Sequence, residues 1–159
     1  MMITVNSTEI HIVPAGKQPD VDAIVEEQDT YLILGTDPFI QDTKENYGTL
    51  VKKMQQQKPL IPGQVLVKNT TPKKFVAIIY DIEKKPACHE EWLILAFENI
   101  LKLCAEHKIN TLAMPLLGHS HGKIEPRNIL DLLQNTINRV APNYPASLYI
   151  NSVNHGLFQ

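Results

Sequence analysis

The stretch from Ile109 to Leu117 constrains the fold more than any other part of the sequence. After Thr111 it contains almost no polar side chain. A strand that is apolar on both faces has to be covered on both faces, which is typical of a central parallel strand between helices. We therefore predict a buried strand here, with Leu112, Met114 and Leu116 in the centre of a sheet.

Helical patterns flank this strand on both sides. An apolar stripe with helical spacing predicts a helix over Glu90 to His107: Leu93, Phe97, Ile100, Leu101 and Cys104. A second stripe predicts a helix that begins near Pro126: Ile129, Leu133, Ile137 and Val140. Ser147 to Asn151 follows as a last strand. This alternation predicts right-handed parallel crossovers and an α/β domain, namely a three-layer α/β/α arrangement around a mixed, mainly parallel sheet.

The first half of the chain has shorter and less regular patterns. Ile3 to Val5 and Glu9 to Val13 predict either a hairpin or two sequential strands. Gln64 to Lys68 and Phe75 to Tyr80, with a turn-rich segment between them, predict a second hairpin. Three further elements are expected: a helix over Pro19 to Gln28, a buried strand over Tyr31 to Leu34, and a helix over Gly48 to Gln57.

Composition limits the protein class. A chain of 159 residues with 43% apolar and 20% charged residues predicts a single domain over residues 1–159. The net charge of -2, with scattered basic residues, argues against nucleic-acid binding. No apolar run approaches the roughly 18 residues of a membrane span, and the N-terminus lacks a signal-like pattern. Cys88 and Cys104 would lie roughly 24 Å apart on one helix, too far for a disulfide. We expect a cytoplasmic protein.

The loop after the central strand is the main candidate for a binding site. Ligands bind at the carboxyl ends of parallel strands, and Gly118 to Lys123 follows such an end. Gly118 and Gly122 are able to adopt positive φ and to let a ligand approach the backbone. Amides of the loop, and of the helix that begins near Pro126, would then donate to an anion. The alternative is a tight connection with no ligand.

These residues resemble a known family. Thr111 to Gly118 resembles the strand and glycine loop of macrodomains, the ADP-ribose-binding modules. Pro62 to Val67, the strand ending at Tyr80, Asp81 to Pro86 and then the long helix are similar in order and spacing to the branch that hydrolyses ADP-ribosyl esters. The resemblance covers roughly residues 29 to 140. It implies the macrodomain fold, and ADP-ribose or an ADP-ribosylated protein as the partner.

The resemblance also implies site residues. Ligand-binding positions would be Gly35, Thr36, Leu117, Gly118, His119, Ser120, His121, Gly122 and Lys123. If the protein is a hydrolase, Asp37 or Glu125 would activate water. In this register Asp29 to Asp37 carries the adenosine and ribose contacts. A second register places Val21 to Val25 on that strand instead, because it is similar to the family's usual sequence.

The chain departs from the family pattern at three places. The adenine-binding Asp expected after the first strand is replaced by Ala15-Gly16-Lys17, with Asp20 and Asp22 displaced. The loop after the next strand, which begins at Gly35, lacks the usual glycines. The second loop contains no acidic residue before Glu125, so no motif supports catalysis. Three functions therefore stay open: ADP-ribose or nucleotide-diphosphate binding, ADP-ribosyl-ester hydrolysis, and an interaction domain that binds no ligand.

The remaining chemistry-bearing residues suggest no cofactor. His119 and His121 would need a third ligand such as His89 or His155 to hold a metal, and no spaced Cys/His set accompanies them. Cys88 is either an activated thiolate at a helix start or an inert thiol, and the second interpretation is favoured. Trp92 is expected in the core rather than as a stacking surface for a base. We predict no metal, and the sequence leaves the oligomeric state open.

Overall fold

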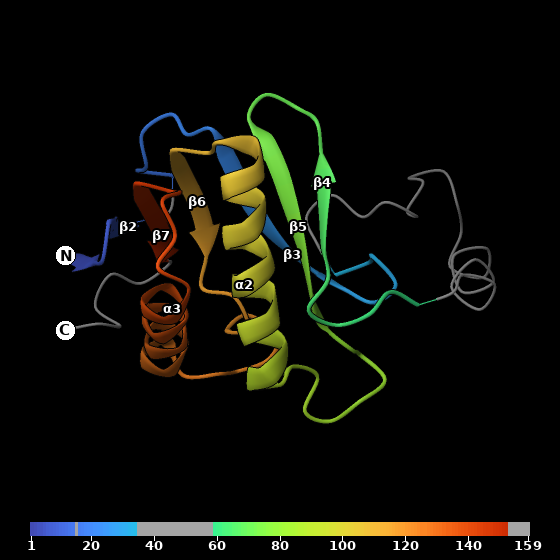
Figure 1. Ribbon diagram of the computed structural model, residues 1–159. Coiled ribbons are helices and arrows are strands. Elements are labelled where there is room, and N and C mark those ends of the chain that lie inside the picture. The colour runs from blue at the N-terminus through green and yellow to red at the C-terminus, as the bar shows by residue number, and fades with distance from the viewer. Residues whose placement is uncertain (15, 35–58, 153–159) are drawn as a thin grey trace.

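The computed structural model describes residues 1–14, 16–34 and 59–152 (Figure 1). The helix expected over Gly48 to Gln57 lies outside the described residues. So do three of the expected site residues, Gly35, Thr36 and Asp37. Within the described ranges, no helix is long and apolar enough to cross a membrane.

The fold is built on one mixed sheet of seven strands in the order β1-β2-β7-β6-β3-β5-β4. In chain order the strands are β1 Met2–Val5, β2 Thr8–Pro14, β3 Ala23–Asp29, β4 Val65–Lys68, β5 Lys73–Tyr80, β6 Thr111–Pro115 and β7 Ser147–Ser152. The two edge strands pair antiparallel with their neighbours, and all other pairs are parallel. This confirms the mixed, mainly parallel sheet and the expected hairpin of β4 with β5, and of the two alternatives left open for β1 and β2 the structure has the hairpin.

The central strand is β6, which lies between β7 and β3. Leu112 is fully buried and Met114 is 2% exposed. Leu116 is also buried, but it follows the strand, which ends at Pro115 rather than at Leu117. The buried, apolar strand predicted from this segment is confirmed.

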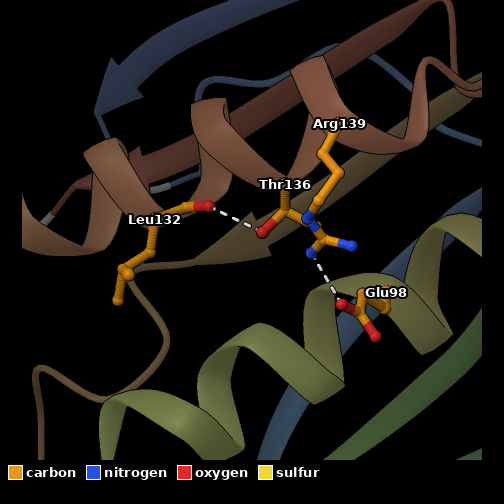
Figure 2. Close-up of polar contacts among 4 residues, drawn as sticks. All are labelled: Glu98, Leu132, Thr136 and Arg139. Carbon is orange, nitrogen blue, oxygen red and sulfur yellow. Dashed lines mark hydrogen bonds and ion pairs between the residues drawn. The ribbon is translucent and has the colours of Figure 1, made fainter.

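The helices α2 (Glu90–His107) and α3 (Pro126–Val140) pack side by side on one face of the sheet (Figure 1). α2 has the bounds that the apolar stripe predicts, and Pro126 occupies the first turn of α3. The outer surfaces of the two helices are joined by Arg139, whose Nη2 donates to Glu98 Oε1 at 2.6 Å (Figure 2). In α3 the Thr136 hydroxyl donates to the carbonyl of Leu132 at 2.7 Å.

Both faces of β5 are buried. Phe75, Ala77 and Ile79 belong to the main core, which includes the inner sides of α2 and α3. Val76 and Ile78 point to the opposite face and pack in a small second cluster with Leu32, Leu60 and Leu66. The described residues supply helices to one face only.

Two expected elements near the N-terminus are wrong. Ala23 to Asp29 forms β3, paired with β5 and β6, where we expected the helix Pro19 to Gln28. The apolar spacing there fits a helix, but alternate residues Ala23 and Val25 bury against the core instead. The second register proposed for Val21 to Val25 is the one that the fold adopts.

Tyr31 to Leu34, expected as a strand, is a turn. The buried carboxylate of Asp29 accepts the backbone amide of Tyr31 at 2.7 Å on Oδ1. On Oδ2 it accepts the amides of Ile33 at 2.9 Å and Leu34 at 2.6 Å. Because one side chain satisfies these three amides, the backbone curls around it instead of joining the sheet.

Candidate functional site

A cavity of about 320 Å³ opens at the carboxyl ends of β3 and β6. Its wall is formed by Val25, Glu26, Glu27, Leu34, Pro115, Ser120 and His121. Three chain segments meet there: the second half of β3, the turn held by Asp29, and the loop that follows β6. The volume falls in the range of small-molecule sites, and the carboxyl edge of a parallel sheet is where such sites are found.

The loop after β6 is fixed by its own hydrogen bonds. The amide of His119 donates to the carbonyl of Leu116 at 3.1 Å, and the amide of Lys123 donates to the carbonyl of His119 at 3.2 Å. The amide of Ile124 donates to the carbonyl of Gly118 at 3.2 Å. His119 Nδ1 lies 3.1 Å from the carbonyl oxygen of Ile124. The loop is therefore a pre-formed unit.

Two amides of this loop are left without an acceptor. Within the described part of the chain, the backbone N–H groups of Ser120 and Gly122 make no hydrogen bond. Ser120 is exposed and lines the cavity. Unengaged amides in a tight turn form a concavity with partial positive charge, which suits an oxyanion.

The two glycines of the loop have different roles from those expected. Gly118 has φ +90°, as predicted, but Gly122 does not have positive φ. A Cβ on Gly122 would lie 2.6 Å from the carbonyl oxygen of Gly118 and 2.7 Å from the Cβ of Cys88. Gly122 is thus required by close packing inside the loop. The left-handed conformation is taken instead by the next residue, Lys123, at φ +54°.

Behind the cavity wall, a chain of hydrogen bonds joins the loop to the sheet. The hydroxyl of Tyr80, at the end of β5, donates to Glu27 Oε2 at 2.5 Å. The same hydroxyl accepts the backbone amide of His121 at 3.4 Å. The ring of His121 meets the Tyr80 ring edge-on, with centroids 5.3 Å apart. Tyr80 is fully buried, so its hydroxyl holds the loop and Glu27 in a fixed relation.

The electrostatics of Glu27 are unusual. Burial raises the pKa of its carboxyl from 4.5 to about 7, although the hydrogen bond from Tyr80 and the charge of His119 oppose this shift. The nearby amide of Gly118 also lowers the pKa of Glu27. Among the described residues, Oε1 has no hydrogen-bond partner of normal geometry and is buried. Burial and the Glu27 charge together raise the pKa of Tyr80, which therefore stays protonated.

The other predicted site residues are spread around this loop. Leu117 is fully buried in the core, and Lys123 is exposed. Glu125 is exposed at the start of α3 and is not part of the cavity wall. Of the predicted residues, Ser120 and His121 line the cavity, while Gly118, His119 and Gly122 shape the loop behind them.

Sequence reasoning missed Glu27, Tyr80 and Pro115. Glu27 was assigned to a helix, and Tyr80 was treated as the last residue of a buried strand. The parallel pairing of β3 with β5 brings them together across 53 positions of sequence. The one available signal was the second register for Val21 to Val25, which places the next residues at a strand end.

Asp22 lies at the opposite edge of the sheet. Its Oδ2 accepts the amides of Asn110 at 2.9 Å and Thr111 at 3.2 Å, at the amino end of β6. Its carboxylate is therefore engaged in holding β3 to β6 at that edge. Asp22 is not in a position to contact a ligand in the cavity.

The structure does not support a reactive or ligand-binding role for Cys88, His89 or Trp92. Burial, and then the charge of Glu27, raise the pKa of the Cys88 thiol to about 12, so it is protonated at neutral pH. The His89 and Trp92 rings meet edge-on at 4.4 Å, and Trp92 is partly exposed rather than in the core. In the described residues, no three His, Cys, Asp or Glu side chains are grouped to hold a metal ion.

The arrangement of the sheet and helices is that of the macrodomain fold. A macrodomain of Thermus aquaticus DarG is 16% identical over 90% of this chain and 97% of its own, with a TM-score of 0.64. The Oceanobacillus iheyensis macrodomain, in a structure with ADP, is 16% identical over 99% of this chain and 90% of its own, with a TM-score of 0.70. A variant of the Oceanobacillus iheyensis macrodomain, in a structure with ADPR, is 14% identical over 99% of this chain and 92% of its own, with a TM-score of 0.70. No family model and no curated protein matches the sequence.

Proposed function

We propose that this chain, which has the macrodomain fold, binds ADP-ribose or a related nucleotide diphosphate, free or attached to a protein. The observation that carries the proposal is the pair of unengaged amides in the pre-formed loop after β6: that of Ser120, which lines the cavity, and that of Gly122, two residues further along. Backbone amides bind phosphate oxygens without any nearby lysine or arginine. Two solved macrodomain structures with similar folds contain ADP or ADPR, which supports a ligand of this class.

The charges around the cavity are compatible with an anion. Two glutamates line it, but Glu26 lies 3.4 Å from the ammonium group of Lys74, which offsets its charge. Glu27 has a pKa of about 7 and is therefore partly neutral at physiological pH. The net charge facing a diphosphate is thus smaller than two carboxylates imply.

A matched pair of substitutions tests the proposal. Ser120 is exposed and lines the cavity, so Ser120→Glu adds one negative charge beside the proposed phosphate position, whereas Ser120→Gln adds similar volume without charge. Calorimetric titration with ADP-ribose should give saturable binding by wild type. Binding by the Glu variant should be weaker than that of the Gln variant by about tenfold or more at low salt. Absence of wild-type binding at millimolar ADP-ribose would leave the ligand-free interaction domain as the better account.

A second candidate function, hydrolysis of an ADP-ribosyl ester, is favoured by one observation. Glu27 is in the cavity wall and its carboxyl has a pKa of about 7, which is suited to general acid or base catalysis near neutral pH. Glu27 is a better candidate for that role than Glu125, which is exposed outside the cavity wall. Release of ADP-ribose from a modified protein, measured for wild type and Glu27→Gln, separates hydrolysis from binding alone.

A further inference from the structure

Tyr80 supports the loop after β6 from its buried side. Its hydroxyl accepts the backbone amide of His121 at 3.4 Å, and its ring meets the His121 ring edge-on. A Cβ added to Gly122 would lie 3.3 Å from Cε1 of the same ring, so the backbone of Gly122 is also packed near Tyr80. Because Tyr80 is fully buried, these contacts hold two consecutive loop residues against the interior of the protein.

The contact with Tyr80 involves the amide that lies between the two free ones. Three other amides of the loop donate to backbone carbonyl groups of the segment that follows β6. The amide of His121 donates to Tyr80 instead. On either side of it, the amides of Ser120 and Gly122 make no hydrogen bond within the described part of the chain. The middle amide of the three is therefore directed to the interior, and its two neighbours remain for a ligand.

Glu27 fixes the direction of the Tyr80 hydroxyl. A backbone amide can only donate, so the hydroxyl oxygen has to accept from His121. The hydroxyl hydrogen is then directed to Glu27 Oε2, at 2.5 Å. Burial and the charge of Glu27 raise the pKa of Tyr80, so the hydroxyl keeps this hydrogen at physiological pH. The hydroxyl thus donates and accepts at the same time, which leaves it one orientation.

We propose that Tyr80 is a positioning residue for the loop after β6: its hydroxyl holds the His121 amide in the interior, and this orients the amides of Ser120 and Gly122 toward a ligand phosphate. The inference rests on the proposed function and deepens it, because it names the residue that sets the loop before the ligand arrives. Donors that are already oriented bind an anion more tightly than donors that have to be ordered on binding. Tyr80 itself is fully buried and touches no ligand.

Tyr80→Phe removes only the hydroxyl and tests the proposal. Calorimetric titration with ADP-ribose should show about tenfold weaker binding than wild type, the factor that corresponds to the loss of one hydrogen bond. Tyr144→Phe is the matched control. Tyr144 is partly buried against the core and precedes β7, which begins beside Thr111 at the opposite edge of the sheet. The affinity of this control should equal that of wild type.

Exchange of backbone amide hydrogens with water, measured by NMR, reports the state of the loop directly. In wild type without ligand, the His121 amide should exchange at least about fivefold more slowly, relative to its intrinsic rate, than those of Ser120 and Gly122. In Tyr80→Phe this difference should disappear, while exchange at Asn110, hydrogen-bonded at the opposite edge, is unchanged. A role of Tyr80 in stability alone would not change exchange selectively at His121.

Two variants of Glu27 separate its hydrogen bond from its charge. Glu27→Gln keeps an oxygen that can accept the Tyr80 hydroxyl, so slow exchange at His121 should be retained. Glu27→Leu has no acceptor, and exchange at His121 should become faster, as in Tyr80→Phe. Both variants remove the same negative charge, so a difference between them is due to the hydrogen bond.

The outcomes distinguish the two proposals. No binding of ADP-ribose by wild type overturns the proposed function and this inference together. Saturable binding by wild type, with equal or tighter binding by Tyr80→Phe, overturns this inference and leaves the proposed function in place. If Tyr80→Phe does not fold, the wild-type exchange rates decide. A His121 amide that exchanges as fast as its two neighbours is not held by Tyr80, and the inference is then wrong.

Discussion

The Tyr80 hydroxyl and Glu27 Oε2 are 2.5 Å apart, and this hydrogen bond joins the ends of β5 and β3 behind the cavity wall. Through the amide of His121 the same hydroxyl also contacts the loop after β6. One buried side chain therefore connects the loop to Glu27, a residue of the cavity wall.

The pH dependence of folding should reveal the buried carboxyl of Glu27. Its pKa in the folded protein, about 7, is above the ordinary 4.5, so the folded state holds the proton more tightly than the unfolded state. Its stabilising contribution is fully present below pH 4.5 and is lost as the pH rises through 7. The loss amounts to at most about 3.5 kcal/mol at roughly 1.4 kcal/mol per pKa unit.

Denaturant unfolding of wild type and Glu27→Gln between about pH 4.5 and pH 8.5 measures this effect. Relative to the variant, wild type should lose free energy of unfolding as the pH rises. Glu98→Gln provides the control, since Glu98 is at the partly exposed ion pair with Arg139. Identical pH dependence in wild type and Glu27→Gln would contradict the burial of this carboxyl.

Gly122→Ala should destabilise the protein through the loop. The added Cβ would lie 2.6 Å from the carbonyl oxygen of Gly118 and 2.7 Å from the Cβ of Cys88, so backbone has to move. We expect a loss of about 1 to 3 kcal/mol in the free energy of unfolding. Ser120→Ala, in the same loop but exposed, should cost less than about 0.5 kcal/mol. Equal stability of the two variants would show that the loop is not packed as described.

Asp29→Asn should cost more stability than a comparable change at Asp81. Asp29 accepts three backbone amides and is fully buried, and an Asn amide group in place of one oxygen would lose up to two of them. We expect a loss of about 2 to 4 kcal/mol. Asp81→Asn affects one exposed bond, to the amide of Glu83, and should cost less than about 1 kcal/mol. Thermal or denaturant unfolding of both variants at pH 7 measures the difference. A larger loss of stability in Asp81→Asn than in Asp29→Asn would refute the role of Asp29.

The turn at Asp29 also shows where sequence reasoning reached its limit. The helix α2 was predicted with its observed bounds because a single apolar stripe and its end signals agree. The strand β3 was not predicted, because Glu26, Glu27 and Gln28 interrupt its apolar alternation. Glu26 and Glu27 have partners on β5, Lys74 and Tyr80, and no local sequence pattern predicts such partners.

In the candidate site, too, features with a local sequence signal were predicted and features that depend on distant partners were not. The loop from Gly118 to Lys123 was located from the sequence, because a glycine-containing stretch after a buried strand has a local signature. The role of Gly122 was not predicted from the sequence, because it depends on contacts with Cys88 and with the Gly118 carbonyl. Glu27 was identified as a site residue only from the pairing of β3 with β5 in the structure.

Both cysteines should be unreactive in the folded protein. Burial raises the pKa of the Cys88 and Cys104 thiols to about 12, so very little thiolate is present at neutral pH. Labelling with a thiol reagent at pH 7.5 should therefore be slow under native conditions and complete for both thiols in denaturant. Rapid native labelling of Cys88 would mean that the region next to Gly122 opens, and would revise the description of the loop as rigid.

The central claim is that the loop amides hold a ligand phosphate, and amide NMR during an ADP-ribose titration tests it most directly. The account predicts saturable shifts of the Ser120 and Gly122 backbone amides, with little change at Asn110, whose amide is held by Asp22 at the opposite edge of the sheet. Saturable binding that leaves Ser120 and Gly122 unshifted would contradict the claim, as would the absence of any shift at millimolar ADP-ribose.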